Sequence, residues 1–342
     1  MGIKRVALWV SRPYQKDEIF NRESVLNRDN FAASFRELQA TIIGWGGSCH
    51  TQDMYINEGV VPDLVIFLDI PRNSVDDILG NWKSKVRKWV ILQECEVILP
   101  RNFDLQRHNE FTKIFTWHDR LIDNSKYIKL NFSHEFKMPI VNLKKEKLVT
   151  LIAGNKRTNH ELELYSKRIE AIRWFEKYHI DDFNLYGVGW DHYRFQNVFP
   201  LKVLNKIKPL TKLLAPKFPS YKGTVLEKRS VLAKYKYAIC YENAKDIPGY
   251  ITEKIFDCFF SGCVPVYWGA NNISEHIPQE CYISKNEFAN YNELYEFMKH
   301  LDERAYLNYL LKAQEFLVSE KSKQFRSRCF ADRILEEIKS VQ

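Results

Sequence analysis

Short apolar runs alternate with helical stretches along this chain, and that alternation constrains the fold more than any other feature of the sequence. In the first half, the runs read as buried parallel strands at residues 6–10, 40–44, 64–68 and 89–92. A polar stretch, 47–62, separates the second run from the third, and residues 74–85 have helical character. Strands that alternate with helices predict a doubly wound α/β sheet.

A second set of the same kind begins near Leu148. Its strands are predicted at 148–153, 183–186, 237–241 and 264–268, with helices at 161–178 and 253–260 and a mostly helical C-terminal end. A length of 342 residues suits two domains, and we divide the chain into residues 1–142 and 143–342. Two such domains facing one another form a cleft at the carboxyl ends of their strands, which is where nucleotides bind.

Composition excludes several classes of protein. Hydrophobic residues make up 45% of the chain and charged residues 27%, so low-complexity and wholly disordered chains are excluded. No apolar run approaches the length of a membrane span, and the first ten residues read as a strand rather than an export signal. The seven cysteines are odd in number and none has C-x-x-C spacing, which favours reduced thiols over a disulfide framework or a zinc site. We therefore expect a folded cytoplasmic protein.

The net charge of +8 is concentrated in one segment. Between residues 201 and 236 there are ten Lys or Arg and one acidic residue, Glu227. Such a segment can meet nucleic acid, anionic lipid or a polyphosphate ligand. Its aromatic residues cluster at one end instead of alternating with the cations, so we expect no nucleic-acid partner. Residues 201–214 combine Lys with apolar residues, which predicts a peripheral contact between segment 201–236 and the inner face of a membrane.

The usual phosphate-binding signatures are missing from the sequence. It contains no G-x-G-x-x-G, no G-x-x-x-x-G-K-[ST] and no Asp-x-Asp that would hold a divalent ion beside a sugar nucleotide. A bound diphosphate would then be neutralised by side-chain cations and helix ends. We expect neither a cofactor nor a divalent metal to be required.

Residues 241–269 carry the clearest chemical pattern. A strand ends at Glu242-Asn243, a polar loop follows, and Thr252 is a good N-cap for a helix that starts at Glu253. Glu253 and Lys254 then lie in the first turn, where free backbone N–H groups and the helix dipole favour an anion. Lys254 adds a full positive charge for a phosphate, and Glu253 can accept hydrogen bonds from ribose hydroxyls. On these residues alone, a ribose-diphosphate site and a capped, solvated helix start both remain open.

Three parts of this segment agree in order and spacing with one known pattern. They are Glu242-Asn243, Tyr250-Ile-Thr-Glu-Lys254 and Val264-Pro-Val-Tyr-Trp-Gly269. In them the chain resembles glycosyltransferase family 10, the α-1,3/4-fucosyltransferases, in its bacterial form. The likeness is tight over 241–269 and looser from Leu148 onward. It implies the GT-B fold, in which two Rossmann-like, doubly wound domains face a central cleft, the first binding the acceptor and the second the GDP-sugar.

The resemblance also implies a set of donor-binding residues. An Arg early in the first helix of the second domain pairs with the diphosphate in this family, and the matching position is Arg168. A guanidinium suits a phosphate leaving group because it binds two oxygens at once. Lys254 would act beside it, while Glu242 would balance positive charge on the sugar ring. The whole donor-binding set is Arg168, Glu242, Asn243, Tyr250, Thr252, Glu253 and Lys254.

In the same family, a Glu in the loop after a strand of the first domain acts as the base. Here the strand at 89–92 is followed by Gln93-Glu94-Cys95-Glu96, so Glu94 is our first choice and Glu96 our second. Together with Arg168 and Lys254, these residues are the expected catalytic groups, and no metal ligand is among them.

The function that the resemblance implies is inverting, metal-independent transfer of L-fucose from GDP-fucose to a hydroxyl of an oligosaccharide or lipid-linked glycan. We expect an α-1,3 linkage, with α-1,4 left open, and a role in lipopolysaccharide, O-antigen or other surface glycan synthesis. One alternative is a family member that uses another GDP-sugar. A different kind of alternative is a non-catalytic basic module in which segment 201–236 binds anionic lipid or RNA.

Overall fold

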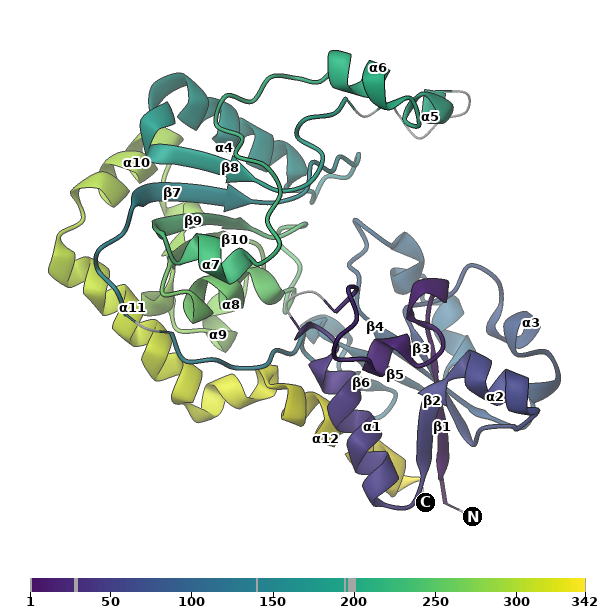
Figure 1. Cartoon of the computed structure of the whole chain (residues 1–342). Coiled ribbons are helices and arrows are strands. Elements are labelled where there is room, and N and C mark those ends of the chain that lie inside the picture. Colours follow the sequence, from purple (N-terminus) through teal and green to yellow (C-terminus); the bar gives the residue numbers. More distant parts are fainter. Residues whose placement is uncertain (1, 28–29, 140, 194, 196–200, 342) are drawn as a thin grey trace.

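The computed structural model describes residues 2–27, 30–139, 141–193, 195 and 201–341, with Lys202 described in its backbone only. Within these residues the chain forms two parallel β-sheets, each packed against helices on both faces (Figure 1). The α/β class and the two Rossmann-like domains predicted from the sequence are confirmed.

The first domain is built on a sheet with the strand order β2-β1-β3-β4-β5-β6. Its strands are β1 (Arg5–Trp9), β2 (Ser48–Thr51), β3 (Leu64–Leu68), β4 (Arg87–Leu92), β5 (Lys113–Thr116) and β6 (Tyr127–Lys129). Successive side chains of a strand point to opposite faces. Leu8 and Ile66 therefore pack under α1 (Ala33–Gly44), whereas Ala7 and Val65 pack toward α2 (Gln52–Glu58) and α3 (Val75–Leu79).

The second domain is built on a sheet with the strand order β11-β10-β9-β7-β8. Its strands are β7 (Lys147–Ile152), β8 (Phe183–Tyr186), β9 (Tyr235–Tyr241), β10 (Val264–Trp268) and β11 (Ile283–Ser284). One face packs against α4 (Tyr165–Tyr178) and α10 (Tyr291–His300), and the other against α7 (Lys228–Leu232), α8 (Glu253–Phe260) and α9 (Ile273–His276). Helix α11 (Glu303–Val318) contributes to both of these cores.

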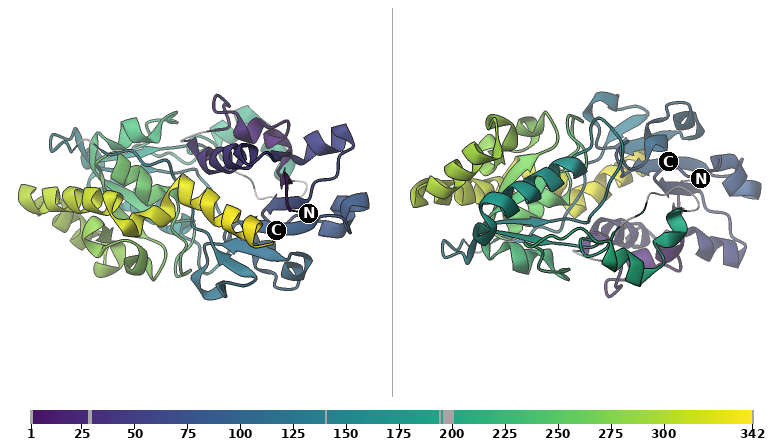
Figure 2. Two further views of the ribbon diagram at one scale, coloured as in Figure 1. Left: turned by 90° about the horizontal axis from the view of Figure 1, so that it is seen from below. Right: turned by 90° about the horizontal axis from the view of Figure 1, so that it is seen from above.

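The last helix returns to the first domain. α12 (Ser327–Ser340) packs on α1, and the rings of Phe330 and Phe35 lie 5.4 Å apart in the first core. This helix belongs to the segment that the sequence assigned to the second domain, yet its apolar face completes the first. Figure 2 shows the yellow C-terminal helices running across both domains. The chain therefore crosses between the domains twice, once after β6 and once between α11 and α12.

Between β8 and β9 the chain forms an arm, residues 201–226, whose short helices stand out from the second domain (Figure 1), whereas its residues 218–222 pack back against β8. It carries the short helices α5 (Leu201–Leu204) and α6 (Lys208–Leu213). Leu213 is 82% exposed and Leu226 is 96% exposed, beside exposed lysines at 206, 208, 212, 217 and 222. Across the described residues, no helix has the length and apolar character needed to span a bilayer.

Several predicted elements differ from the observed ones. The run 40–44 is not a strand, because Phe35, Leu38 and Ile42 recur at helical spacing and bury one face of α1. The polar stretch 47–62 contains β2 and α2, and β5 and β6 were not predicted. The strands β2, β5 and β6 are short. Their Ser, His, Lys and Thr residues interrupt the apolar run by which a buried strand is recognised in a sequence. The predicted helix 253–260 is confirmed residue for residue as α8.

A polar contact joins the two domains beside the cleft. The carboxylate of Asp119, after β5, accepts hydrogen bonds from Lys129, from Nδ2 of Asn272 at 2.8 Å and from Nε2 of His276 at 2.8 Å. Gly249 lies against the same loop with a φ of +80°, and a Cβ there would collide with the carbonyl oxygen of Trp117. This contact holds loop 246–251 of the second domain on the strand-end loop of the first.

Candidate active site

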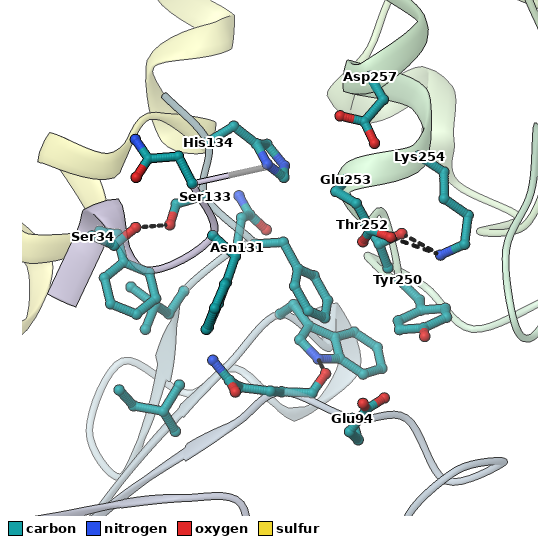
Figure 3. Close-up of a pocket in the computed structure, with 18 of the residues that line it drawn as sticks. Ser34, Glu94, Asn131, Ser133, His134, Tyr250, Thr252, Glu253, Lys254 and Asp257 are labelled. Atoms are coloured by element: carbon teal, nitrogen blue, oxygen red, sulfur yellow. Dashed lines mark hydrogen bonds and ion pairs between the residues drawn. The ribbon is translucent and has the colours of Figure 1, made fainter. Parts of the chain in front are cut away.

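A cavity of about 400 Å³ lies between the two domains at the carboxyl ends of their strands (Figure 3). A second cavity of about 220 Å³ adjoins it and reaches into the second domain. The walls of both include Lys156, Lys228, Asn243, Glu253, Lys254 and Asp257. Because the two cavities share these residues, they form one continuous site that both domains line.

Lys254 lies in the first turn of α8 with its ammonium held on two sides. Its Nζ donates to Oε2 of Glu242 at 2.9 Å and to Oγ1 of Thr252 at 2.8 Å. Burial lowers the pKa of Lys254, but the carboxylates of Glu242 and Glu253 outweigh that effect and hold the pKa above its ordinary value. Its side chain is 23% exposed and lines both cavities. The lysine is therefore a fixed cation at the junction.

Glu242 is fully enclosed at the end of β9. Besides Lys254, its carboxylate accepts hydrogen bonds from the backbone N–H of Thr252 at 2.8 Å and from the Thr252 hydroxyl at 2.7 Å. Gly269 makes room for it, because a Cβ at that position would lie 2.6 Å from Cγ of Glu242. Glu242 lines neither cavity. It therefore contacts the site through Thr252 and Lys254, and its role toward the sugar ring stays a prediction.

The cap of α8 differs from the one predicted. Thr252 occupies the N-cap position, but its hydroxyl donates to Glu242 and accepts no hydrogen bond from the helix's first turn. An N-cap hydroxyl oxygen usually accepts a hydrogen bond from the helix backbone. Here the hydroxyl oxygen of Thr252 accepts one from Nζ of Lys254 instead. The backbone N–H groups of the first turn of α8 therefore receive no hydrogen bond from the Thr252 side chain.

Glu253 sits between two cations. Its Oε1 lies 3.6 Å from Nζ of Lys254 and 3.9 Å from Nζ of Lys228, and the side chain is 44% exposed. Burial raises the pKa of Glu253, but the two lysines overcome it and hold the pKa well below its ordinary value. Lys228 also forms an ion pair at 2.9 Å with Asp257, one turn along α8. Glu253 is therefore an ionised hydrogen-bond acceptor that can meet ligand hydroxyls in the cavity.

Arg168 reaches the site from the first turn of α4. One nitrogen, Nη2, donates to the carbonyl oxygen of Tyr241 at 2.6 Å and to Oδ1 of Asn243 at 3.0 Å. Nδ2 of Asn243 in turn donates to the hydroxyl of Tyr250 at 3.3 Å. The guanidinium is buried, which lowers its pKa, and it lines the second cavity. Arg168 thus brings positive charge to the cavity wall and also orients Asn243.

Glu94 faces the same cavity from the first domain. It follows β4 by two residues, and Figure 3 shows its carboxylate directed toward Tyr250. Among the described residues no hydrogen bond or ion pair reaches that carboxylate. Burial and the nearby charge of Asp69 raise the pKa of Glu94. An unpartnered carboxylate with a raised pKa, open to a cavity, has the properties of a general base.

Glu96, the second choice for the base, lies elsewhere. It lines neither cavity, while Glu94 two residues earlier does. Of the nine residues selected from the sequence, the structure brings Glu94, Arg168, Asn243, Tyr250, Thr252, Glu253 and Lys254 to the cavity walls. Glu242 lies directly behind them.

Several further cavity residues, among them two lysines and a histidine, were not selected from the sequence. Lys156 lines both cavities from the turn after β7, and Lys228 lines both from α7. His134 stacks on Phe256 with ring centroids 4.5 Å apart, and burial lowers its pKa to about 3, so its ring is neutral. The Ala-Gly-Asn-Lys turn after a predicted strand was a usable indication for Lys156. Nothing local distinguishes Lys228 from the other lysines of its basic segment.

The charges around the junction suit an anionic ligand. Lys156, Lys228, Lys254 and Arg168 converge there from four different elements of the second domain. Among the described residues, no cluster of three or more His, Cys, Asp or Glu side chains has the arrangement to hold a metal ion. The positive charge of this part of the site is complementary to a polyphosphate, and the carboxylate of Glu253 lies beside it.

Comparisons with known proteins agree with this geometry. Residues 142–340 match the family model of glycosyltransferase family 10 (fucosyltransferase), C-terminal part. Among curated proteins, the α-(1,3)-fucosyltransferase FucT of Helicobacter pylori is 34% identical over 88 residues, which are 25% of this chain and 18% of that protein. The matched segment thus spans less than a fifth of the length of that relative.

Solved structures of related proteins share the whole fold. The crystal structure of an α1,3-fucosyltransferase matches with a TM-score of 0.57 at 14% identity, covering 98% of this chain and 89% of the other. An α1,3-fucosyltransferase structure with GDP-fucose matches with a TM-score of 0.53 at 14% identity, covering 97% and 89%. At this identity the likeness shows the fold alone, which is GT-B as expected.

Proposed function

This chain belongs to glycosyltransferase family 10, and on that premise we propose that it transfers L-fucose from GDP-fucose to a hydroxyl of an acceptor glycan. The observation that carries the proposal is the pairing of two groups across one cavity. Glu94 of the first domain, a carboxylate with a raised pKa, and Lys254 of the second, a fixed cation, line the same space. Transfer between an acceptor and a sugar diphosphate requires a base and a cation in this relation.

The donor lies with its diphosphate at the junction of the two cavities. Lys254, Lys156 and Lys228 neutralise the phosphates, and Arg168 adds charge from the inner wall. Glu253 accepts hydrogen bonds from the ribose hydroxyls, since its carboxylate is ionised and 44% exposed. A related structure that carries GDP-fucose, solved on the same fold, supports this choice of donor.

The reaction inverts the anomeric centre. The acceptor hydroxyl gives its proton to Glu94 as its oxygen bonds to the anomeric carbon of fucose. On the opposite face, the bond from that carbon to the phosphate oxygen breaks, and its electron pair leaves with GDP. Lys254 stabilises the negative charge that grows on the departing diphosphate. Asn243 and Tyr250, which are hydrogen-bonded to each other, complete the wall between base and cation.

Charge stabilisation by side chains makes the reaction independent of a divalent metal. The four cations at the junction already supply the positive charge that a metal ion would bring to the diphosphate. Activity that persists undiminished in excess EDTA is the expected result. Activity that EDTA abolishes and Mg²⁺ or Mn²⁺ restores would contradict this part of the proposal.

The acceptor is a glycan carried at a membrane, with an α-1,3 linkage as the product. The arm combines highly exposed leucines, at 213 and 226, with exposed lysines, which suits contact with an anionic lipid surface. We assign it a peripheral contact that keeps the enzyme near lipid-linked precursors of lipopolysaccharide or other surface glycans. Co-sedimentation should occur with vesicles containing anionic phospholipid, weaken with salt, and fail with neutral vesicles. Binding to both kinds of vesicle alike would contradict it.

The test of the function is GDP release from GDP-fucose, with and without N-acetyllactosamine-type and O-antigen-type acceptors, in EDTA. Release stimulated by one acceptor class is the expected result and identifies that class. GDP binding without release, followed by turnover of a different GDP-sugar, would reassign the donor and keep the family. Absence of any GDP binding would overturn the proposal and favour a basic module that binds lipid or RNA.

A further inference from the structure

Behind the proposed base lies a second carboxylate, Asp69, that the proposed mechanism does not use. It directly follows β3, the neighbour of β4 in the sheet, and adopts a left-handed backbone with a φ of +62°. Among residues with a Cβ, mainly Asn and Asp tolerate this conformation. Its own N–H still donates to the carbonyl oxygen of Ile91 at 2.9 Å. The turn therefore aims the side chain back at the end of β4.

One oxygen of Asp69 organises the loop that carries Glu94. Oδ1 accepts hydrogen bonds from the backbone N–H of Gln93 at 2.6 Å and from the backbone N–H of Glu94 at 3.1 Å. These two amides lie just past the last residue of β4, where the sheet no longer pairs them. The backbone from which the Glu94 side chain leaves the strand is thus held by the Asp69 carboxylate.

Asn102 strengthens the same arrangement. Its side chain is fully buried, and Nδ2 donates both to Oδ1 of Asp69 at 2.7 Å and to the carbonyl oxygen of Glu94 at 2.9 Å. Its Oδ1 accepts from the N–H of Ile70 at 2.9 Å. Every polar atom of the amide is therefore engaged in joining the end of β3 to the backbone of Glu94. A network that is fully satisfied in this way is rigid.

The charge on Asp69 also acts on Glu94. Four charged groups bear on the Glu94 carboxylate: Asp69 and Glu253 raise its pKa, and Lys156 and Lys254 lower it. Burial raises the pKa further. Burial raises the pKa of Asp69 itself, and the amides just described and Arg101 counter that effect only in part. Of the two carboxylates that raise the pKa of Glu94, Asp69 has the larger effect, and it counters the two lysines that lower that pKa.

We propose that Asp69 is a positioning residue for transfer, which fixes the backbone of Glu94 through two amide hydrogen bonds. The proposal rests on the proposed function, because it assigns Asp69 to the group that takes the acceptor proton. Asp69 lines neither cavity, so it touches neither donor nor acceptor.

Two substitutions separate the hydrogen bonds of Asp69 from its charge. Asp69→Asn keeps an oxygen for the amides and a residue that tolerates the left-handed turn, but removes the charge. The acid side of its kcat/KM profile should move to lower pH, while GDP binds with unchanged Kd. Asp69→Gly tolerates the turn and removes the oxygen. We expect it to lower kcat about tenfold or more with little change in GDP affinity, the usual result of loosening a positioned group.

The matched control is Asp17→Asn. Asp17 also has a left-handed backbone, with a φ of 59°, and its Oδ1 accepts from the backbone N–H of Thr51 at 2.8 Å, at the end of β2. It does not line the cavity. Activity and pH profile should be unchanged in this variant.

Dependence on Glu94 is tested by combining substitutions. In a Glu94→Gln background, Asp69→Gly should cause no further loss, because the group that Asp69 positions is already gone. Losses that multiply, or a wild-type pH profile in Asp69→Asn, would overturn the inference.

Carbon-13 NMR of the Glu94 carboxyl, assigned with Glu94→Gln, gives a readout without substrates. A lower titration midpoint in Asp69→Asn supports the inference, because it places the Asp69 carboxylate beside Glu94, and an unchanged midpoint overturns it. Lack of transfer by the wild-type enzyme would count against the proposed function alone.

Discussion

Nζ of Lys254 lies 2.9 Å from Oε2 of Glu242, so a cation that faces the cavity is tied to a carboxylate that solvent does not reach. The two residues are separated by a loop, and the hydroxyl of Thr252 bonds both. Because Glu242 is enclosed, its charge acts on Lys254 with little screening. The lysine is thereby held in place and kept protonated before any donor arrives.

Replacing Lys254 by Met should abolish most of the transfer activity. The side chain supplies charge where the leaving diphosphate develops it, and losing one such group lowers kcat/KM about a hundredfold or more. GDP-release kinetics measure the effect. Lys245→Met is the matched control, since Lys245 lies in the loop that precedes α8, pairs with Asp246 and lines neither cavity. Equal rates for the two variants would remove Lys254 from the mechanism.

Glu242→Gln should weaken both stability and catalysis. The amide leaves the partly buried ammonium without its counter-charge, and breaking a buried pair in this way costs about 3 kcal/mol. The pKa of Lys254 should fall, because Glu242 is the larger of the two carboxylate effects that raise it. Transfer should then decline at a lower pH on the alkaline side. Denaturant unfolding and a kcat/KM profile test these points, and an unshifted alkaline limb would contradict the second.

Glu94→Gln should reduce turnover about a hundredfold or more while GDP affinity is unchanged, because the base is lost and the donor contacts remain. The same variant should unfold at higher temperature at neutral pH. A carboxyl with a raised folded pKa destabilises the fold when ionised, and this penalty vanishes below its unfolded pKa. Thermal unfolding at neutral and acid pH measures the difference. Glu96→Gln, two residues away and outside the cavity, should show neither effect.

Asp119→Asn should loosen the contact between the domains. Burial raises the pKa of Asp119, but hydrogen bonds from His276, Lys129 and Asn272 overcome it and hold the pKa well below its ordinary value. The contact therefore stabilises the protein above the ordinary pKa of Asp, and that stabilisation disappears as the pH falls through the lowered value. At neutral pH the substitution should cost about 2 kcal/mol of unfolding free energy. A wild-type stability at neutral pH would contradict this.

The sequence predicted the second domain better than the first. β10 is a continuous apolar run, and α8 has a Thr-Glu start and a Ser-Gly end, so local pattern and tertiary environment agree. β5 and β6 are short and amphipathic, and only pairing with longer strands makes them part of a sheet. The helical run at 40–44 was mistaken for a strand because its β-branched residues favour extended structure.

The residues of the candidate site also differ in how well the sequence predicted them. Glu253 and Lys254 stand in a short motif, and Glu94 was chosen by resemblance as the carboxylate that follows a strand; all three line the cavity. Glu242 was assigned a place facing the sugar, and its enclosure depends on Gly269, which β10 brings beside it. Lys228 enters the cavity because α7 packs against α8. No local sequence pattern predicts the packing of α7 against α8.

The return of α12 to the first domain has a topological consequence. Ile338 and Lys339, near the end of α12, border the same groove as Gly2 and Ile3. The described part of the backbone therefore traces a nearly closed circuit through both domains and brings Ile3 and Ile338 to one groove of the first domain. A circular permutant whose old ends are joined by a short linker, and whose new ends are cut in the arm, would keep both crossings. A chain cut between β6 and β7 would keep only one covalent connection between the two domains, the segment between α11 and α12.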